Sequence, residues 1–133
     1  MFLNVHSLTV GRPREFNIES AIIAATRLFI TDGYEGCSMD RLVQSTGIHR
    51  GSLYAAFGSK RGIFLECLRT TLTDTADPPS SSELLLVALG ELAARDDEIR
   101  ALCAQAIKAR GENAAHELGI QLLARAGLNE GHV

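Results

Sequence analysis

Apolar residues recur along the chain every three to four positions, which is the period of an amphipathic α-helix. The first such stripe has the spacing i, i+4, i+7, i+10 and i+11 and consists of Ile18, Ile22, Ala25, Leu28 and Phe29. Asn17 is a good N-cap before it, and Gly33 after it can adopt the left-handed conformation that ends a helix. No stretch alternates apolar and polar residues as a half-buried strand does. The pattern predicts an all-α protein.

Two short helices are predicted directly after the first. Ser38 is a capping residue in front of a helix at Met39–Ser45. Gly47 then supplies the positive φ that a sharp reversal of the chain requires. A second short helix, His49–Phe57, follows at once and ends before Gly58. Two short helices joined by a tight turn indicate a helix-turn-helix, in which the second helix enters the major groove of DNA.

The rest of the chain is also predicted to be helical. Ser59 caps a connecting helix over residues 59–73, and the prolines and serines of residues 74–82 indicate a linker. Three helices rich in Ala and Leu follow: Leu84–Ala94, Ile99–Arg110 beginning at Asp97, and Ala114–Ala126 capped by Asn113. The predicted division is an N-terminal extension at 1–10, a helix-turn-helix domain at 11–58, the connecting helix, the linker, a C-terminal helical region at 83–127 and a tail at 128–133.

The predicted second helix of the motif presents candidate DNA contacts. Leu53 is expected to anchor this helix from behind, so the opposite face is free to meet DNA. Side chains expected to reach base edges are His49, Arg50, Ser52 and Ala55, and those expected near phosphates are Tyr54 and Lys60. The first N–H groups of the helices that begin after Ser38 and Ser59 are further anion sites.

Length and composition agree with one small water-soluble protein. The chain has 133 residues, of which 46% are apolar, enough for a real core without disulfides. No apolar run approaches the roughly 20 residues that span a bilayer. No Lys or Arg precedes Arg12 and no small-residue cleavage site follows, so the start is a poor signal peptide. We expect a cytoplasmic protein that does not associate with membranes.

Charge is unevenly distributed although the formal net charge is only −3. Residues 1–62 carry a net charge of +2 and residues 63–133 a net charge of −5. The stretch Arg41–Leu65 contains four Arg and Lys residues and no acidic residue. Since a polyanion responds to local charge within about 10 Å, this stretch predicts a basic patch that suits nucleic acid.

Signs of catalysis or of metal binding are lacking in the sequence. The three cysteines are far apart and odd in number, which argues against disulfides and zinc and favours small buried side chains. His116 and His132 have no ligand partners at metal spacing, and no nucleophile, zinc or phosphate-loop motif occurs. We expect no enzyme, no cofactor and no metal site. A thiol switch at Cys37, beside the helix-turn-helix, is an open alternative.

An ordered set of residues over positions 11–72 resembles the N-terminal domain of the TetR family of transcriptional repressors. The set comprises Gly11-Arg12-Pro13-Arg14-Glu15-Phe16, Ala21 to Phe29, Gly33-Tyr34, Ser38-Met39, Gly47-Ile48, Gly51-Ser52-Leu53-Tyr54, Phe57 and Ser59-Lys60. The resemblance implies a homodimer that binds a palindromic double-stranded DNA operator and represses transcription until a small-molecule effector binds the C-terminal domain. It also implies DNA contacts at Gly51, Ser52, Tyr54 and Lys60, and a minor-groove arm containing Arg12 and Arg14.

The sequence departs from the family most strongly after residue 73. The C-terminal region is shorter than is usual in the family, and the helices that normally wall the ligand pocket are largely missing between Thr73 and Ser82. We therefore expect a TetR-like helix-turn-helix domain followed by a shortened helical dimerisation bundle. The expected dimer interface includes Leu85, Leu89, Leu118 and Leu122. The alternative is a DNA-binding or heterodimerising module without an effector pocket.

Overall fold

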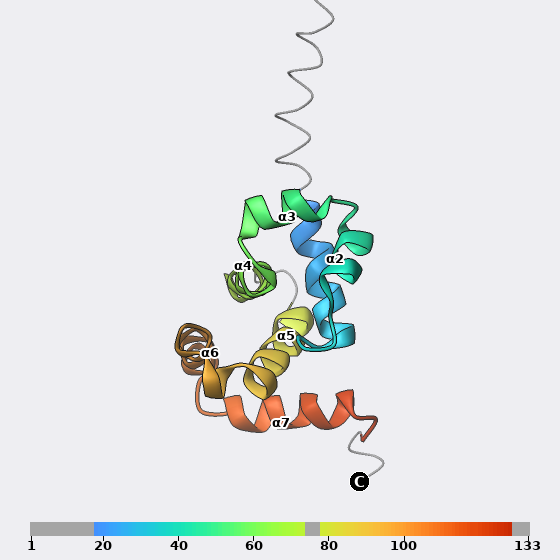
Figure 1. The fold of residues 1–133 in the computed structure, drawn as a ribbon. Helices are drawn as coiled ribbons and strands as arrows, with labels where there is room; N and C mark the ends of the chain where they lie inside the picture. The colour runs from blue at the N-terminus through green and yellow to red at the C-terminus, as the bar shows by residue number, and fades with distance from the viewer. Residues whose placement is uncertain (1–17, 74–77, 129–133) are drawn as a thin grey trace, which may run out of the picture.

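Every regular element of the computed structural model is a helix within residues 18–73 and 78–128, the part that the structure describes (Figure 1). The first helix spans residues 18–32. The others are α2 (Met39–Thr46), α3 (Arg50–Phe57), α4 (Lys60–Thr73), α5 (Pro78–Glu91), the 3₁₀ turn η1 (Ala93–Arg95), α6 (Asp97–Arg110) and α7 (Ala114–Arg125). The all-α prediction is confirmed. The predicted cap Asn17 lies outside the described residues.

Two predicted serine caps are present, at the beginnings of α2 and α4. The Ser38 hydroxyl accepts a hydrogen bond from Arg41 N at 3.1 Å, and the Ser59 hydroxyl accepts one from Gly62 N at 2.9 Å. The reversal between α2 and α3 occurs at Gly47, which has φ +73°, a value that L side chains rarely adopt. Helix α6 begins at Asp97 as predicted, and Asp96 caps it, because its carboxylate accepts a hydrogen bond from Ile99 N at 3.1 Å.

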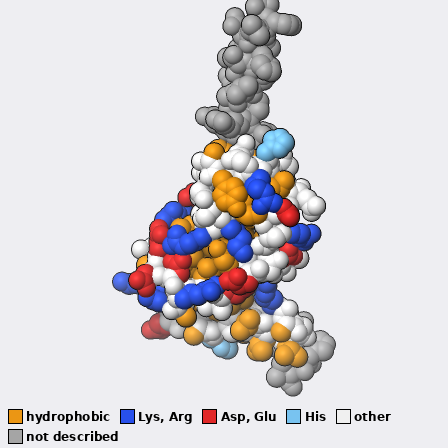
Figure 2. Space-filling model, in the orientation of Figure 1, with side chains coloured by type: hydrophobic (Ala, Val, Ile, Leu, Met, Phe, Trp, Pro, Cys, Tyr) orange, Lys and Arg blue, Asp and Glu red, His pale blue; other side chains and the backbone are white. Residues whose placement is uncertain are grey.

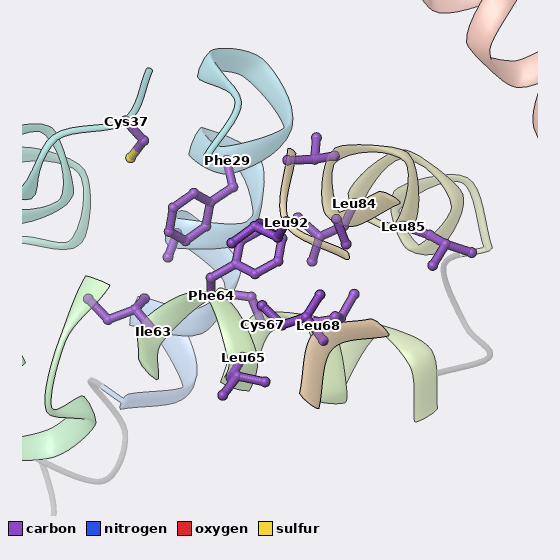
Figure 3. Packing of buried hydrophobic residues seen from close by; sticks show 14 of the residues in the cluster. Phe29, Cys37, Ile63, Phe64, Leu65, Cys67, Leu68, Leu84, Leu85 and Leu92 are labelled. Atoms are coloured by element: carbon purple, nitrogen blue, oxygen red, sulfur yellow. The ribbon is translucent and has the colours of Figure 1, made fainter. Parts of the chain in front are cut away.

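A single hydrophobic core joins the two predicted regions of the chain. Phe29 of the first helix and Phe64 of α4 meet edge to face with ring centroids 5.1 Å apart. Helix α5 packs against α4, α6 and α7 and adds Leu84, Leu85 and Leu92 to the same cluster (Figure 3). The buried cluster continues to residue 118 on α7. The C-terminal helices therefore complete the core of the N-terminal ones.

The predicted linker is shorter than expected, because α5 begins at Pro78. Proline is tolerated in the first turn of a helix, where the N–H groups have no intrahelical acceptor and φ is already suitable. Ser81 and Ser82 are 8% and 7% exposed, so this part of the serine run lies in a packed helix. Residues 78–82 therefore belong to the C-terminal helices.

Two of the four leucines expected at a dimer interface are buried inside the protomer. Leu85 is 0% exposed and Leu118 is 7% exposed, so both side chains pack into the core of the protomer. Leu89 is partly buried against the same cluster. Leu122 is 54% exposed. The exposed large apolar side chains of α7 and the residues after it are Ile120, Leu122, Leu123 and Leu128.

Candidate nucleic-acid interface

Helices α2 and α3 form the predicted helix-turn-helix, and α3 lies at the end of the molecule opposite α7 (Figure 1). Leu42 of α2 and Leu53 of α3 are 0% and 1% exposed, so each helix is anchored on the core by one leucine. Ile48 in the turn is partly buried against the same core. This packing leaves the opposite face of α3 without a covering element among the described residues.

Six of the residues predicted to contact DNA, whether at bases or at phosphates, lie on the uncovered face and first turn of α3. All of them are exposed: His49, Arg50, Gly51, Ser52, Tyr54 and Ala55. His49 occupies the N-cap position but its side chain makes no capping hydrogen bond. The first N–H groups of α3 are therefore not satisfied by that side chain, and such groups suit phosphate oxygens.

The predicted basic patch is partly neutralised by carboxylates from outside the stretch Arg41–Leu65. Arg50 pairs with Asp40 across the helix-turn-helix, and Arg41 pairs with Asp32 at 3.1 Å. Both arginines are about half exposed, and such surface pairs are worth only about 0–1 kcal/mol. A phosphate or a guanine edge can therefore compete with Asp40 for Arg50 at little cost.

Arg61 pairs with the acidic beginning of α6. Its guanidinium donates to Asp96 at 2.6 and 3.0 Å and to Glu98 at 3.0 Å. Hydrogen bonding from Arg61 lowers the pKa of Asp96 to about 2. Arg69 of α4 also pairs with Glu98, at 2.6 Å. Figure 2 shows such basic and acidic side chains interleaved across the middle of the molecule, so the two oppositely charged halves partly neutralise each other.

Lys60 has a different environment from the one a phosphate contact requires. Its ammonium donates to the carbonyl oxygens of Tyr34 and Cys37 at 2.9 and 3.1 Å. It also lies 4.2 Å from the centroid of the Tyr34 ring, a cation–π distance. The side chain is half-buried, so the structure favours an internal role for Lys60 over the predicted phosphate contact.

The remaining predicted contacts have mixed outcomes. Ser38 is exposed beside α2, and its hydroxyl already serves as the helix cap. Arg12 and Arg14 lie outside the described residues.

Glu91 makes hydrogen bonds that could not be predicted from the sequence. Its carboxylate accepts hydrogen bonds from the N–H groups of Tyr34 and Glu35 at 3.1 and 2.8 Å. Arg95, one turn later, pairs with the Glu35 side chain. These partners are separated by 56 to 60 residues in sequence, and no local pattern marks such a contact.

A groove of about 470 Å³ lies beside the helix-turn-helix, between the first helix, the end of α3 and α4. Its apolar wall includes Ile22, Phe57 and Leu65, and its charged residues are Arg61, Glu66 and Arg69. Each of these charged side chains already takes part in an ion pair. Among the described residues that line it, the groove therefore offers no unpaired charge to an anionic ligand.

The cysteines have the properties of core residues. Cys37, Cys67 and Cys103 are buried free thiols. Burial raises the pKa of all three, to about 12 for Cys67 and about 11 for Cys103. Because the thiolate is the reactive form, the burial of Cys37 and the upward direction of its pKa argue against a thiol switch there. Within residues 18–73 and 78–128, no group of three or more His, Cys, Asp or Glu residues is placed to hold a metal ion.

A short helix pair with a sharp glycine reversal and a polar, exposed second helix defines the helix-turn-helix class of DNA-binding proteins. Residues 22–67 match the family described as "Bacterial regulatory proteins, tetR family". Residues 22–67, which contain the helix-turn-helix, are therefore similar to the TetR family. None of the described helices has the length and apolar character needed to cross a membrane.

Several bacterial repressors are similar to this chain. The HTH-type transcriptional repressor BdcR of Escherichia coli (strain K12) is 41% identical over 78 residues, which are 59% of this chain and 40% of the relative. The HTH-type transcriptional repressor AcnR of Corynebacterium glutamicum is 37% identical over 86 residues, which are 65% of this chain and 46% of the relative. The chain spans less than half the length of these relatives. No solved structure matches it.

Proposed function

We propose that this protein is a DNA-binding transcriptional regulator that reads its operator with α3. The observation that carries the proposal is the set of exposed residues from His49 to Ala55 on a helix whose other face is anchored by Leu53. Arg50 is the best candidate for base recognition, because arginine pairs well with a guanine edge and its present partner is an exposed carboxylate. Ser52 and Tyr54 are proposed to contact nearby backbone or bases, and Arg12 and Arg14 to reach the minor groove.

Repression is the proposed sense of regulation. The relatives BdcR and AcnR both carry the name of transcriptional repressors, and a regulator that occupies an operator blocks the polymerase by its presence. Since its target is the bacterial chromosome, we place the protein in the cytoplasm.

A homodimer on a palindromic operator is the proposed assembly. Helix α7 and the short segment after its end expose Ile120, Leu122, Leu123 and Leu128, each between 40% and 54%. Contiguous exposed apolar surface is usually covered by a partner, and a twofold dimer matches a twofold-symmetric DNA site. Of the four leucines expected at the interface, Leu122 and Leu89 remain candidates.

Release by a small-molecule inducer is part of the proposal, with ligand-independent binding or heterodimerisation as the second candidate. The packing of α5 favours the second candidate, because its residues Leu84, Leu85 and Leu92 lie in the shared core. Thermal unfolding with a panel of small apolar compounds distinguishes the two, since a ligand of the folded state raises the melting temperature.

Selection of bound fragments from a random DNA library is the direct test of the proposed function. The expected result is an enriched sequence with two inverted half-sites whose centres lie about one helical turn of DNA apart, or a multiple of it. Affinity for that sequence should fall steeply with salt, with a slope of about −0.9 in log K for each neutralised phosphate. A library that shows no enrichment after repeated rounds contradicts the proposal.

A further inference from the structure

The turn that joins the first helix to α2, residues 33–37, is held from two sides by opposite charges. On one side, the Glu91 carboxylate of α5 accepts hydrogen bonds from two N–H groups of the turn, those of Tyr34 and Glu35, at 3.1 and 2.8 Å. On the other side, the Lys60 ammonium of α4 donates hydrogen bonds to two carbonyl oxygens of the turn, those of Tyr34 and Cys37, at 2.9 and 3.1 Å. Charge-assisted hydrogen bonds of this kind are stronger than neutral ones, so the turn is fixed to α4 and α5 together.

Packing around the turn makes this arrangement specific. The Tyr34 ring lies between the Lys60 ammonium and the core aromatic rings, with centroids 5.9 Å from Phe29 and 5.3 Å from Phe64. Gly33 has φ +79°, and a Cβ there would lie 2.7 Å from the Glu91 carboxylate oxygen. The backbone conformation favours glycine at this position, and a Cβ there would also displace the Glu91 carboxylate from the turn.

Both ends of the helix-turn-helix are connected to this turn. The turn leads directly into the cap Ser38 and α2, and Lys60 is the first residue of α4, which follows α3. The pair α2–α3 is thus held at its beginning by the turn and at its end by the helix that carries Lys60. Glu91 extends this connection to α5, in the C-terminal half of the chain.

We infer that Glu91 and Lys60 are positioning residues for DNA binding. They fix the orientation of α2–α3 relative to α4 and α5 through the turn at residues 33–37, and Lys60 acts through the carbonyl oxygens of Tyr34 and Cys37 rather than by neutralising a phosphate. The inference rests on the proposed function for its consequence in DNA binding. The contact of Glu91 with the turn can be tested without DNA.

The first experiment measures amide hydrogen exchange of Tyr34 and Glu35 in the free protein. Glu91→Ala removes both acceptors, and these two amides are expected to exchange at least about tenfold faster while the core amides do not change. Glu91→Gln, which keeps one acceptor, is the milder variant if Glu91→Ala does not fold. Glu112→Ala, at an exposed carboxylate before α7, is the control and should leave both amides unchanged. Unchanged exchange in both Glu91 variants overturns the inference.

The second experiment compares binding of selected operator and of random DNA over a range of salt concentrations. Lys60→Met keeps the apolar stem and removes the ammonium. A positioning role predicts a loss of about tenfold for operator, a smaller loss for random DNA and an unchanged salt slope. A slope reduced by about 0.9, with equal losses on both DNAs, shows a phosphate contact and overturns the role of Lys60.

Failure of the wild-type protein to select any sequence would overturn the proposed function and the role in DNA binding with it. The exchange result would still show whether Glu91 holds the turn, so the two failures are distinguishable.

Discussion

Helices α3 and α7 lie at opposite ends of the molecule and differ in what they leave uncovered (Figure 1). Each is anchored by few buried residues, Leu53 in α3 and Ala114 and Leu118 in α7. The exposed side chains of α3 are polar, cationic or small, whereas α7 exposes Ile120, Leu122 and Leu123. Because both helices are exposed but present different side chains, exposure alone does not define a binding site. The exposed face of α3 suits the nucleic acid proposed above, and that of α7 suits the proposed second protomer.

These two ends are joined by a common interior, which makes them parts of one folding unit. The buried cluster extends from the first helix to α7, and ion pairs such as Arg61–Asp96 connect the basic half to the acidic half. A change at one end can therefore reach the other through packed and charged contacts.

The largest effect is expected from Phe64→Ala, at the centre of the shared core. Phe64 is 0% exposed, and loss of a buried phenylalanine costs about 3–5 kcal/mol. Denaturant unfolding followed by circular dichroism should show one transition at a lower midpoint, with all helical signal lost together. Tyr54→Ala, at a side chain that is 43% exposed, is the control and should change the midpoint little. A residual transition that keeps half of the helix would show two independent units.

A smaller effect, on assembly, is expected from Leu122→Asp on α7. A charge buried without a partner in an apolar interface should raise the dimer dissociation constant by about 30-fold or more. Light scattering over a range of protein concentrations measures this shift. Gln105→Asp, at an exposed position of α6, is the matched control. If Leu122→Asp has the size of the wild type at every concentration, α7 is not the interface.

At the other end, Arg50→Ala should weaken operator binding by about 1–3 kcal/mol. Random DNA should lose much less, because base recognition is absent there. Asp40→Asn removes the intramolecular partner of Arg50 and should preserve or slightly strengthen operator binding. Competition binding with both DNAs measures these differences. Equal losses on operator and random DNA would count against base reading by Arg50.

The smallest effect is expected from Asp96→Asn, which breaks the ion pair between the halves but keeps a good N-cap for α6. The pair is partly exposed, so the loss at pH 7 should be about 1 kcal/mol or less. Because the folded pKa of Asp96 is lowered from 3.8 to about 2, its contribution is present above about pH 4 and is lost as the pH falls toward 2. Urea unfolding should show the gap between wild type and variant closing over this range. If the stability difference between wild type and variant stays constant from about pH 4 to pH 2, the Asp96 carboxylate does not stabilise the fold through the ion pair with Arg61.

Much of the local structure could be predicted from the sequence. The cap at Ser38, the reversal at Gly47 and the anchor at Leu53 were expected and are confirmed. These features depend on residues within one or two helical turns, where side chain and backbone meet whatever the rest of the chain does. Pro78 was misleading, because the same residue suits both a linker and the first turn of a helix.

The candidate interface could be predicted only in part. Leu53 is the buried anchor of α3, and the helical period therefore predicts that residues such as Gly51 and Ala55 lie on the opposite, exposed face. The role of Lys60 could not be deduced, since its acceptors at Tyr34 and Cys37 precede it by 26 and 23 residues. The stretch from Arg41 to Leu65 has no acidic residue, but its three arginines form ion pairs with carboxylates that lie outside the stretch.

By itself, the sequence determined the all-α class, the helix-turn-helix and the face of α3 that is free to meet DNA. Helical periodicity and capping act over three to four residues and need no distant partner. Only the tertiary structure decided that Leu85 and Leu118 are core residues while Leu122 is exposed. It also brought Glu91 to the turn before α2, across 57 residues. Burial and ion pairing depend on how helices pack in space. Leucines or carboxylates in the same local sequence pattern can therefore have different roles in the folded protein.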